Sequence, residues 1–188
     1  MKKLLCAVVL LLAVGCVWEP FAMYDYKAII EVTPCVAQTI NSVVVMRDTT
    51  NPPDTGHYYL DTTYTLNVTV YLQEMTGKKF RFEGAECRLY DSKGGYIRDI
   101  GGATLIPPVT NEEQDSVAVA MKITLDELAH NDIERLDIAN EAEKWNAGTG
   151  FLGFTGAGTE IDHALSVDCL EGFAPITVTR GVIRIEVP

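Results

Sequence analysis

The chain has 188 residues, of which 47% are hydrophobic, and a formal net charge of −11 at pH 7. This length suits a single domain with a core of its own. The excess of acidic residues argues against binding to nucleic acid or to anionic lipid headgroups, so no nucleic-acid partner is expected.

The N-terminal 16 residues have the pattern of a bacterial secretion signal. Lys2 and Lys3 precede an unbroken apolar run over residues 4–14, which is too short to span a bilayer as a helix and suits the core of a signal peptide. The run ends in Ala-Val-Gly-Cys at residues 13–16, which resembles the lipobox of bacterial lipoproteins. The resemblance implies that Cys16 is acylated and becomes the N-terminus after cleavage. A plain secreted protein and an uncleaved anchor are the alternatives.

The expected domain organisation follows from that cleavage site. Residues 1–15 form a signal peptide, residues 16–24 a lipidated tether, and residues 25–188 the folded domain. Several acyl chains on one cysteine give lasting membrane attachment, because each buried methylene adds about 0.8 kcal/mol. The membrane is therefore an expected partner, and the expected location is the bacterial cell envelope. The outer membrane or the cell surface is favoured, because Val17 provides no acidic signal for retention at the inner membrane.

Period-two alternation of apolar residues predicts an all-β domain. The clearest strand covers residues 64–72, where Leu66, Val68, Val70 and Leu72 share one face. Bulges are expected at Gly84 and at Gly181, where the apolar alternation changes phase. The other expected strands cover residues 27–33, 42–46, 80–89, 96–98, 117–123, 165–169 and 176–187. About eight strands with short connections indicate an antiparallel β-sandwich.

One segment, residues 124–145, favours an inserted acidic helix. Thr124 and Glu127 have the spacing of a capping box, and a break is expected near Asn131. The helix acids are expected to form its solvated face; they are Asp132, Glu134, Asp137, Glu141 and Glu143.

A resemblance to a known family covers residues 64–97. A strand that ends in Leu-Gln-Glu-Met is followed by a Thr-Gly turn at residues 76–77 and by a strand that ends in Leu89-Tyr90-Asp91. This arrangement is similar to bacterial immunoglobulin-like domains, including those named for an F-x-L-Y-D motif, with Cys87 at the position of the Phe. The resemblance implies an immunoglobulin-like sandwich that binds or spaces rather than catalyses.

Two cysteines of the expected domain alternate with apolar residues and are expected to point inward. A bridge between Cys87 and Cys169 would close a loop of about 80 residues and stabilise the fold by roughly 4 kcal/mol. The alternative is a pair of buried thiols that pack as small apolar side chains.

The glycine-rich segment over residues 148–158 is expected to be a mobile loop. It contains the letters G-x-G-x-x-G, but a dinucleotide site needs a strand before this motif and a helix after it, and here a helix is expected before it. Phe151 and Phe154, together with Trp145, are candidate contacts for a sugar or a peptide. The alternative is that the two phenylalanines pack on the end of the sandwich.

No residues have the spacing of a catalytic or metal site, so no enzyme activity, metal or cofactor is expected. The histidines are His57, His130 and His163, which are far apart in the sequence. Calcium could use acids in two loops, although a solvated acidic surface is favoured; these acids are Glu112, Glu113, Asp115, Glu160 and Asp162.

Together these features predict a non-enzymatic, lipid-anchored envelope protein that serves adhesion, scaffolding or ligand binding. Its partner would be an envelope protein or a glycan. The alternative function is a carbohydrate- or peptide-binding accessory module of a secreted hydrolase system.

Overall fold

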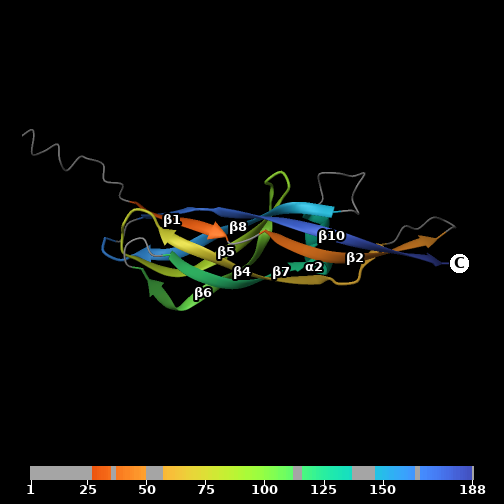
Figure 1. Cartoon of the computed structure of the whole chain (residues 1–188), viewed down its shortest axis with the longest axis horizontal. Coiled ribbons are helices and arrows are strands. Elements are labelled where there is room, and N and C mark those ends of the chain that lie inside the picture. The colour runs from red at the N-terminus through yellow and green to blue at the C-terminus, as the bar shows by residue number, and fades with distance from the viewer. Residues whose placement is uncertain are drawn as a thin grey trace, which may run out of the picture.

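Two β-sheets form most of the described chain in this computed structural model, which describes residues 27–34, 37–49, 57–111, 116–136, 147–163 and 166–187 (Figure 1). The strands are β1 (Lys27–Pro34), β2 (Gln38–Thr49), β3 (His57–Tyr59), β4 (Thr63–Glu74), β5 (Phe80–Asp91), β6 (Tyr96–Thr110), β7 (Ser116–Asp126), β8 (Ala147–Glu160), β9 (Ser166–Leu170) and β10 (Gly172–Val187). Two short helices, α2 (Glu127–His130) and α3 (Asp132–Leu136), follow β7. No helix in these ranges is long and apolar enough to cross a membrane.

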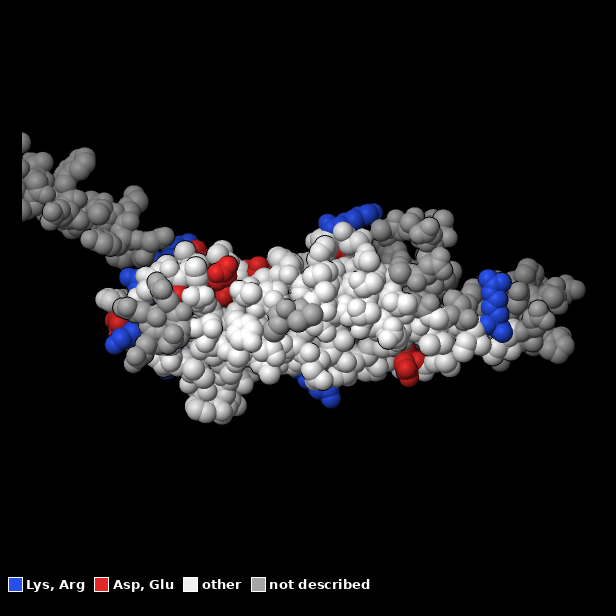
Figure 2. Space-filling view, in the orientation of Figure 1, with Lys and Arg blue, Asp and Glu red and all other residues white. Residues whose placement is uncertain are grey.

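The smaller sheet has the strand order β7-β4-β1-β9, and the larger has the order β3-β2-β10-β8-β5-β6. Strands β6 and β7 lie against each other where the two sheets meet, so the sheets close on that side as a half-barrel. Strands β2 and β10 run side by side toward the end of the molecule where the chain terminates (Figure 1). Charged side chains are sparse over the middle of the face turned toward the viewer in Figure 2.

The expectation of a mostly-β domain with two sheets is confirmed, whereas the antiparallel arrangement is wrong. Strand β1 pairs with β9 in parallel, and β10 pairs with β2 in parallel over twelve residue pairs. Both pairs join segments that lie more than a hundred residues apart. A local alternation pattern gives the face of a strand but not its distant neighbour or its direction, which explains the error.

The core lies between the sheets, and it confirms the faces expected for β4 and β5. Val68, Val70 and Leu72 are buried, and Leu66 packs against the core from a half-buried position. In β5 the buried set changes from Phe80 and Phe82 to Ala85, Cys87 and Leu89. The pairing of β5 with both neighbours shifts between Phe82 and Gly84, as expected for a bulge. The prediction of a bulge at Gly181 is wrong, because β10 keeps one register with β2 from Ile176 to Val187.

The glycine-rich segment is a central strand rather than a mobile loop. Strand β8 pairs with β5 on one side and with β10 on the other. Its glycines allow the neighbouring chains to come close. A Cβ atom at Gly150 would lie 2.4 Å from the carbonyl oxygen of Tyr90, and one at Gly158 would lie 2.4 Å from that of Arg81. Gly150 and Gly158 are therefore required by strand packing.

The inserted helix begins later than expected, and Thr124 is not its N-cap. Strand β7 continues to Asp126, whose side chain accepts a hydrogen bond from the backbone N–H of Ala129 (2.8 Å) and caps α2. The break expected at Asn131 is confirmed, because this residue has the left-handed φ of 53° and separates α2 from α3. The rest of the expected helix, residues 137–145, lies outside the described residues.

Candidate binding surface

Four aromatic side chains lie on the outer face of the six-stranded sheet, turned away from the core. They are Tyr90 of β5, Tyr96 of β6, Phe151 of β8 and Phe173 of β10, and we call them the aromatic cluster. The Tyr90 ring centroid is 5.9 Å from that of Tyr96 and 5.5 Å from that of Phe173, and both contacts are edge-to-face. Phe151 is the register partner of Tyr90 on β8. Tyr96 and Phe173 are 56% and 51% exposed, so ring surface is available to a ligand.

The aromatic cluster can form because β8 has no side chain at Gly153. A Cβ atom there would lie 2.5 Å from Tyr90 Cε2 and 3.1 Å from Phe173 Cε1. The same position lies 2.5 Å from Glu171 Oε1. The rings and the carboxylate thus occupy the space that any other residue at position 153 would take.

A chain of polar contacts connects the aromatic cluster to the acidic side chains of β5 and β6. The hydroxyl of Tyr90 donates a hydrogen bond to Glu171 (2.8 Å). Desolvation, followed by this bond, raises the pKa of Tyr90, so the phenol stays protonated. Arg88 interacts electrostatically with Tyr90 and, through Nε, lies 3.4 Å from Asp99. Its Nη2 lies 3.8 Å from Glu86.

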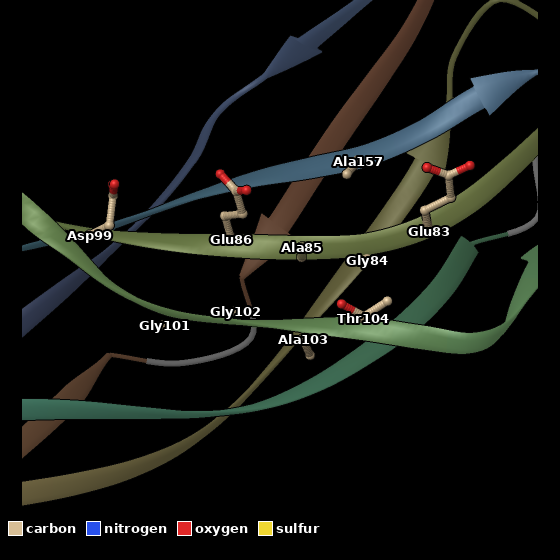
Figure 3. A pocket seen from close by; sticks show the side chains of 10 residues that line it. All are labelled: Glu83, Gly84, Ala85, Glu86, Asp99, Gly101, Gly102, Ala103, Thr104 and Ala157. Carbon is tan, nitrogen blue, oxygen red and sulfur yellow. The ribbon is translucent and has the colours of Figure 1, made fainter.

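A groove of about 550 Å³ lies at the end of this polar chain and crosses β6, β5 and β8 (Figure 3). Residues without long side chains form much of its lining: Gly84, Ala85, Gly101, Gly102, Ala103 and Ala157. The carboxylates of Glu83, Glu86 and Asp99 stand on the same side of the β5 and β6 ribbons (Figure 3). We call this feature the acidic groove. Its volume lies in the range of about 300–1,000 Å³ that is common for ligand sites.

The acidic groove keeps an excess of negative charge despite two nearby arginines. Glu83 pairs with Arg81 at 3.2 Å and accepts a hydrogen bond from the hydroxyl of Thr159 (3.1 Å). Arg88 is shared between Glu86 and Asp99. Because two carboxylates share one guanidinium, the groove retains a net negative charge.

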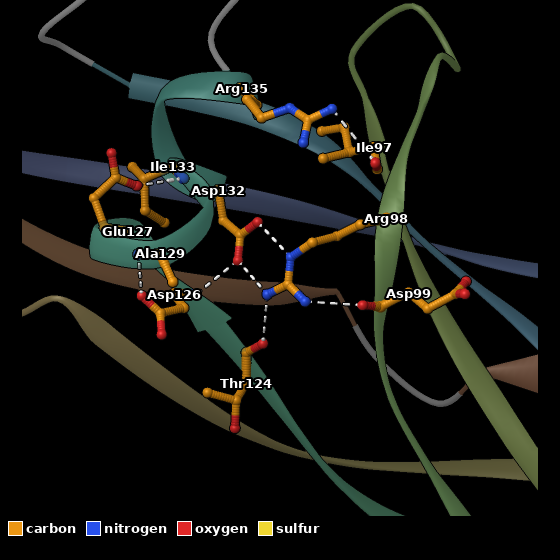
Figure 4. Close-up of polar contacts among 10 residues, drawn as sticks. All are labelled: Ile97, Arg98, Asp99, Thr124, Asp126, Glu127, Ala129, Asp132, Ile133 and Arg135. Atoms are coloured by element: carbon orange, nitrogen blue, oxygen red, sulfur yellow. Dashed lines mark hydrogen bonds and ion pairs between the residues drawn. The ribbon is translucent and has the colours of Figure 1, made fainter.

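A buried ion pair fixes β6 beside this groove (Figure 4). Arg98 donates from Nε and Nη2 to the two carboxylate oxygens of Asp132, at 2.7 and 2.5 Å. The same guanidinium donates to the carbonyl oxygens of Thr124 (3.3 Å) and Asp99 (2.8 Å). It therefore ties β6, β7 and α3 together at the residue where Asp99 enters the acidic groove.

Two acids of the helical insert, Asp132 and Glu127, are buried. Asp132, expected on the solvated face of the helix, is fully buried and also accepts a hydrogen bond from the backbone N–H of Asp126 (2.6 Å). Glu127 is 4% exposed and accepts from the backbone N–H of Ile133 (2.6 Å). Both carboxylates stabilise the chain reversal between β7 and α3 by satisfying backbone donors.

The structure separates the three aromatic residues expected to contact a ligand. Phe151 lies in the aromatic cluster and is 36% exposed. The prediction that Phe154 contacts a ligand is wrong, because its side chain is 1% exposed and packs in the core between the sheets. Strand alternation turns these two side chains to opposite faces of β8. Trp145 lies outside the described residues.

Sequence reasoning missed Tyr90, Tyr96 and Phe173 as members of a site. Tyr90 and Tyr96 flank the turn at residues 91–95, and both residues were treated only as fold signals. Gly153 is a signal that could have indicated this site, because a glycine in a strand leaves room for outward aromatic side chains of the neighbouring strands. This signal applies only if residues 148–158 form a strand, and they were expected to form a loop.

The structure describes Cys87 and Cys169 as free thiols, and both pack against the core. Burial, with a smaller contribution from the charge of Glu171, raises the pKa of Cys87 to about 12. Burial also raises the pKa of Cys169, whose sulfur accepts a hydrogen bond from the backbone N–H of Gly156 (3.0 Å). Both thiols therefore stay protonated near neutral pH and are poor nucleophiles.

Within the described ranges no three His, Cys, Asp or Glu side chains are arranged to hold a metal ion. Glu160, one of the acids considered for calcium, is buried and accepts hydrogen bonds from the backbone N–H groups of Asp162 (3.1 Å) and His163 (2.7 Å). This carboxylate stabilises the turn after β8. The other acidic loop considered, residues 112–115, lies outside the described residues.

Comparison with known proteins assigns no family to this geometry. No family model matches the chain, and no curated protein matches it. The functional conclusions for this chain therefore rest on its own residues and their arrangement.

The Arg98–Asp132 pair predicts a large effect of one substitution on stability. Asp132→Ala removes the carboxylate that pairs with the Arg98 guanidinium and accepts from the Asp126 N–H, and should lower the free energy of unfolding by about 3 kcal/mol. The value is at the low end for a buried pair because the Arg98 side chain is 22% exposed. Urea denaturation followed by circular dichroism measures the change.

A matched control is Asp168→Ala, which removes an exposed carboxylate paired with Lys27 at 2.8 Å. Exposed pairs contribute about 0.2–1 kcal/mol, so this variant should stay close to the wild type. Equal losses in the two variants would contradict the role assigned to Asp132.

Proposed function

We propose that this chain is a non-enzymatic binding protein of the bacterial cell envelope, attached to the membrane through a lipid on Cys16. It holds its ligand on the outer face of the six-stranded sheet. The observation that carries this proposal is the exposed aromatic cluster beside the acidic groove. A binding surface needs apolar area for affinity and polar groups for orientation, and this face offers both within one patch.

The chemistry of the described cysteines supports a binding role over catalysis by a thiol. A nucleophilic cysteine needs a lowered pKa and access to substrate. Burial raises the pKa of both Cys87 and Cys169. The carboxylates of the acidic groove are exposed, and each lies near an arginine, which is an arrangement suited to ligand contact.

An immunoglobulin-like relationship is part of the proposal. Leu89-Tyr90-Asp91 ends β5, and the Asp91 side chain accepts hydrogen bonds from the backbone N–H groups of Lys93 (2.8 Å) and Gly95 (2.7 Å). Asp91 thus builds the turn into β6, which explains why an acid follows the tyrosine. The parallel pairs β1–β9 and β2–β10 set this chain apart from a purely antiparallel sandwich.

A second candidate function is a carbohydrate-binding accessory module of a secreted hydrolase system. The position of Phe151 beside Tyr90 favours it, because exposed aromatic faces can stack on sugar rings. This candidate uses the same surface and differs only in the ligand class.

The lipid anchor predicts selective acylation. Labelled palmitate should enter the wild-type chain and should not enter Cys16→Ser, because the sulfur of residue 16 is the expected acceptor. Cys6→Ser is the control, since residue 6 would leave with the signal peptide and its loss should not change labelling. Labelling of Cys16→Ser at the wild-type level would exclude the anchor.

The binding surface predicts that the double variant Tyr96→Ala/Phe173→Ala loses ligand binding by roughly tenfold or more, since each exposed ring contributes on the order of 1 kcal/mol. The full chain would be screened against arrays of glycans and peptides, and the best ligand titrated. Tyr71→Ala, which removes an exposed ring (43%) from the other sheet, is the matched control. A ligand that binds the double variant as tightly as the wild type would rule out this surface.

A further inference from the structure

We infer that the acidic groove and the aromatic cluster together bind a basic, extended polypeptide segment of a partner protein. This inference rests on the proposed function and names its ligand class. The chemistry that would recognise the surface is a row of Lys or Arg side chains on a chain that lies across β6, β5 and β8.

The surface carries an excess of negative charge. Four carboxylates and two guanidinium groups lie on it, which gives a formal net charge of −2; they are Glu83, Glu86, Asp99 and Glu171, with Arg81 and Arg88. The side chains of Glu86 and Asp99 are 67% and 72% exposed. These carboxylates can therefore pair with a partner's cations, and the net charge of −11 on the whole chain adds long-range attraction.

The form of the groove suits an extended chain. It crosses three strands, and its lining of glycine and alanine leaves the sheet surface open between the carboxylates. An extended chain can lie along such a surface and direct alternate side chains toward it, since side chains of an extended chain point to opposite sides in turn. The acids at Glu83 and Glu86 are on the same strand and the acid at Asp99 is on the next, so successive basic residues would meet separate carboxylates.

The aromatic cluster favours a cationic peptide over a sugar chain. Aromatic faces attract Lys and Arg side chains through cation–π contacts. The planes of Tyr96 and Phe173 are turned 71° and 67° from that of Tyr90. The rings therefore do not form one flat platform for stacked sugar rings, whereas basic side chains can approach exposed faces from several directions.

The test measures fluorescence anisotropy of labelled probes with the full chain in detergent. The main probe is a peptide of about eight residues, roughly 26 Å when extended, with Lys and Val alternating. A peptide with Glu in place of Lys and a β-linked tetrasaccharide of glucose are the comparison probes. The variant is the isosteric triple Glu83→Gln/Glu86→Gln/Asp99→Asn.

A second triple variant changes the net charge by the same amount away from the surface. Glu31→Gln/Asp61→Asn/Asp162→Asn alters three exposed acids on β1 and on two turns. The Lys peptide should bind the wild type and this control with affinities within about twofold, and should bind the groove variant about tenfold more weakly. Ionic strength of about 1 M should weaken binding to the wild type, because the Debye length falls to about 3 Å.

The outcomes separate the inference from the proposed function. Equal weakening in both triple variants would overturn the inference, because nonspecific attraction would then explain the binding. Binding of the tetrasaccharide without the Lys peptide would overturn the inference and leave the proposed function intact. Absence of binding by every probe would also overturn the inference, and the proposed function would still be judged by the array screen.

Discussion

The glycines of β8 determine how closely the strands of the larger sheet pack. Strand β8 occupies the middle of the larger sheet, between β5 and β10, and its glycines leave room that those neighbours fill. On the core side a Cβ atom at Gly150 would also meet Leu136 of α3 at 2.5 Å. Strand β8 therefore connects β5 to β10 within the sheet, and at Gly150 it leaves room for Leu136 of the helical insert. Glycine in a strand costs conformational entropy, but a larger residue at these positions would clash with the neighbouring strands.

The outer face follows from the same constraint. Because Gly153 has no side chain, Tyr90, Phe173 and Glu171 can converge over β8. Tyr90 then connects two kinds of surface, since its ring packs against Tyr96 and Phe173 while its hydroxyl bonds to Glu171. Arg88 carries this contact on to the acidic groove. The Arg98–Asp132 pair fixes β6 at Asp99, so a buried interaction at the base of the insert determines the position of an exposed carboxylate.

Local patterns were sufficient for some of this fold and insufficient for the rest. The alternation in β4 and the bulge at Gly84 were predictable, because each depends on which face of one strand is buried. The parallel pairs were not, because the pairing of β1 with β9 is decided by contacts between opposite ends of the chain. Strand β8 was missed because glycine gives no apolar period, and Phe151 followed by Leu152 breaks the alternation expected of a strand. Asp132 was misplaced because an acid that pairs with a distant arginine looks, in an acidic segment, like any solvated acid.

Amide hydrogen exchange across β8 measures whether this segment is a central strand. As a central strand, Ala147–Glu160 donates its backbone N–H groups to β5 and β10, so these amides should exchange slowly, with protection close to that of Val68 and Val70 in β4. Rapid exchange through residues 148–158, at the rate of an exposed loop, would contradict the central position of β8 and the surface that is built on it.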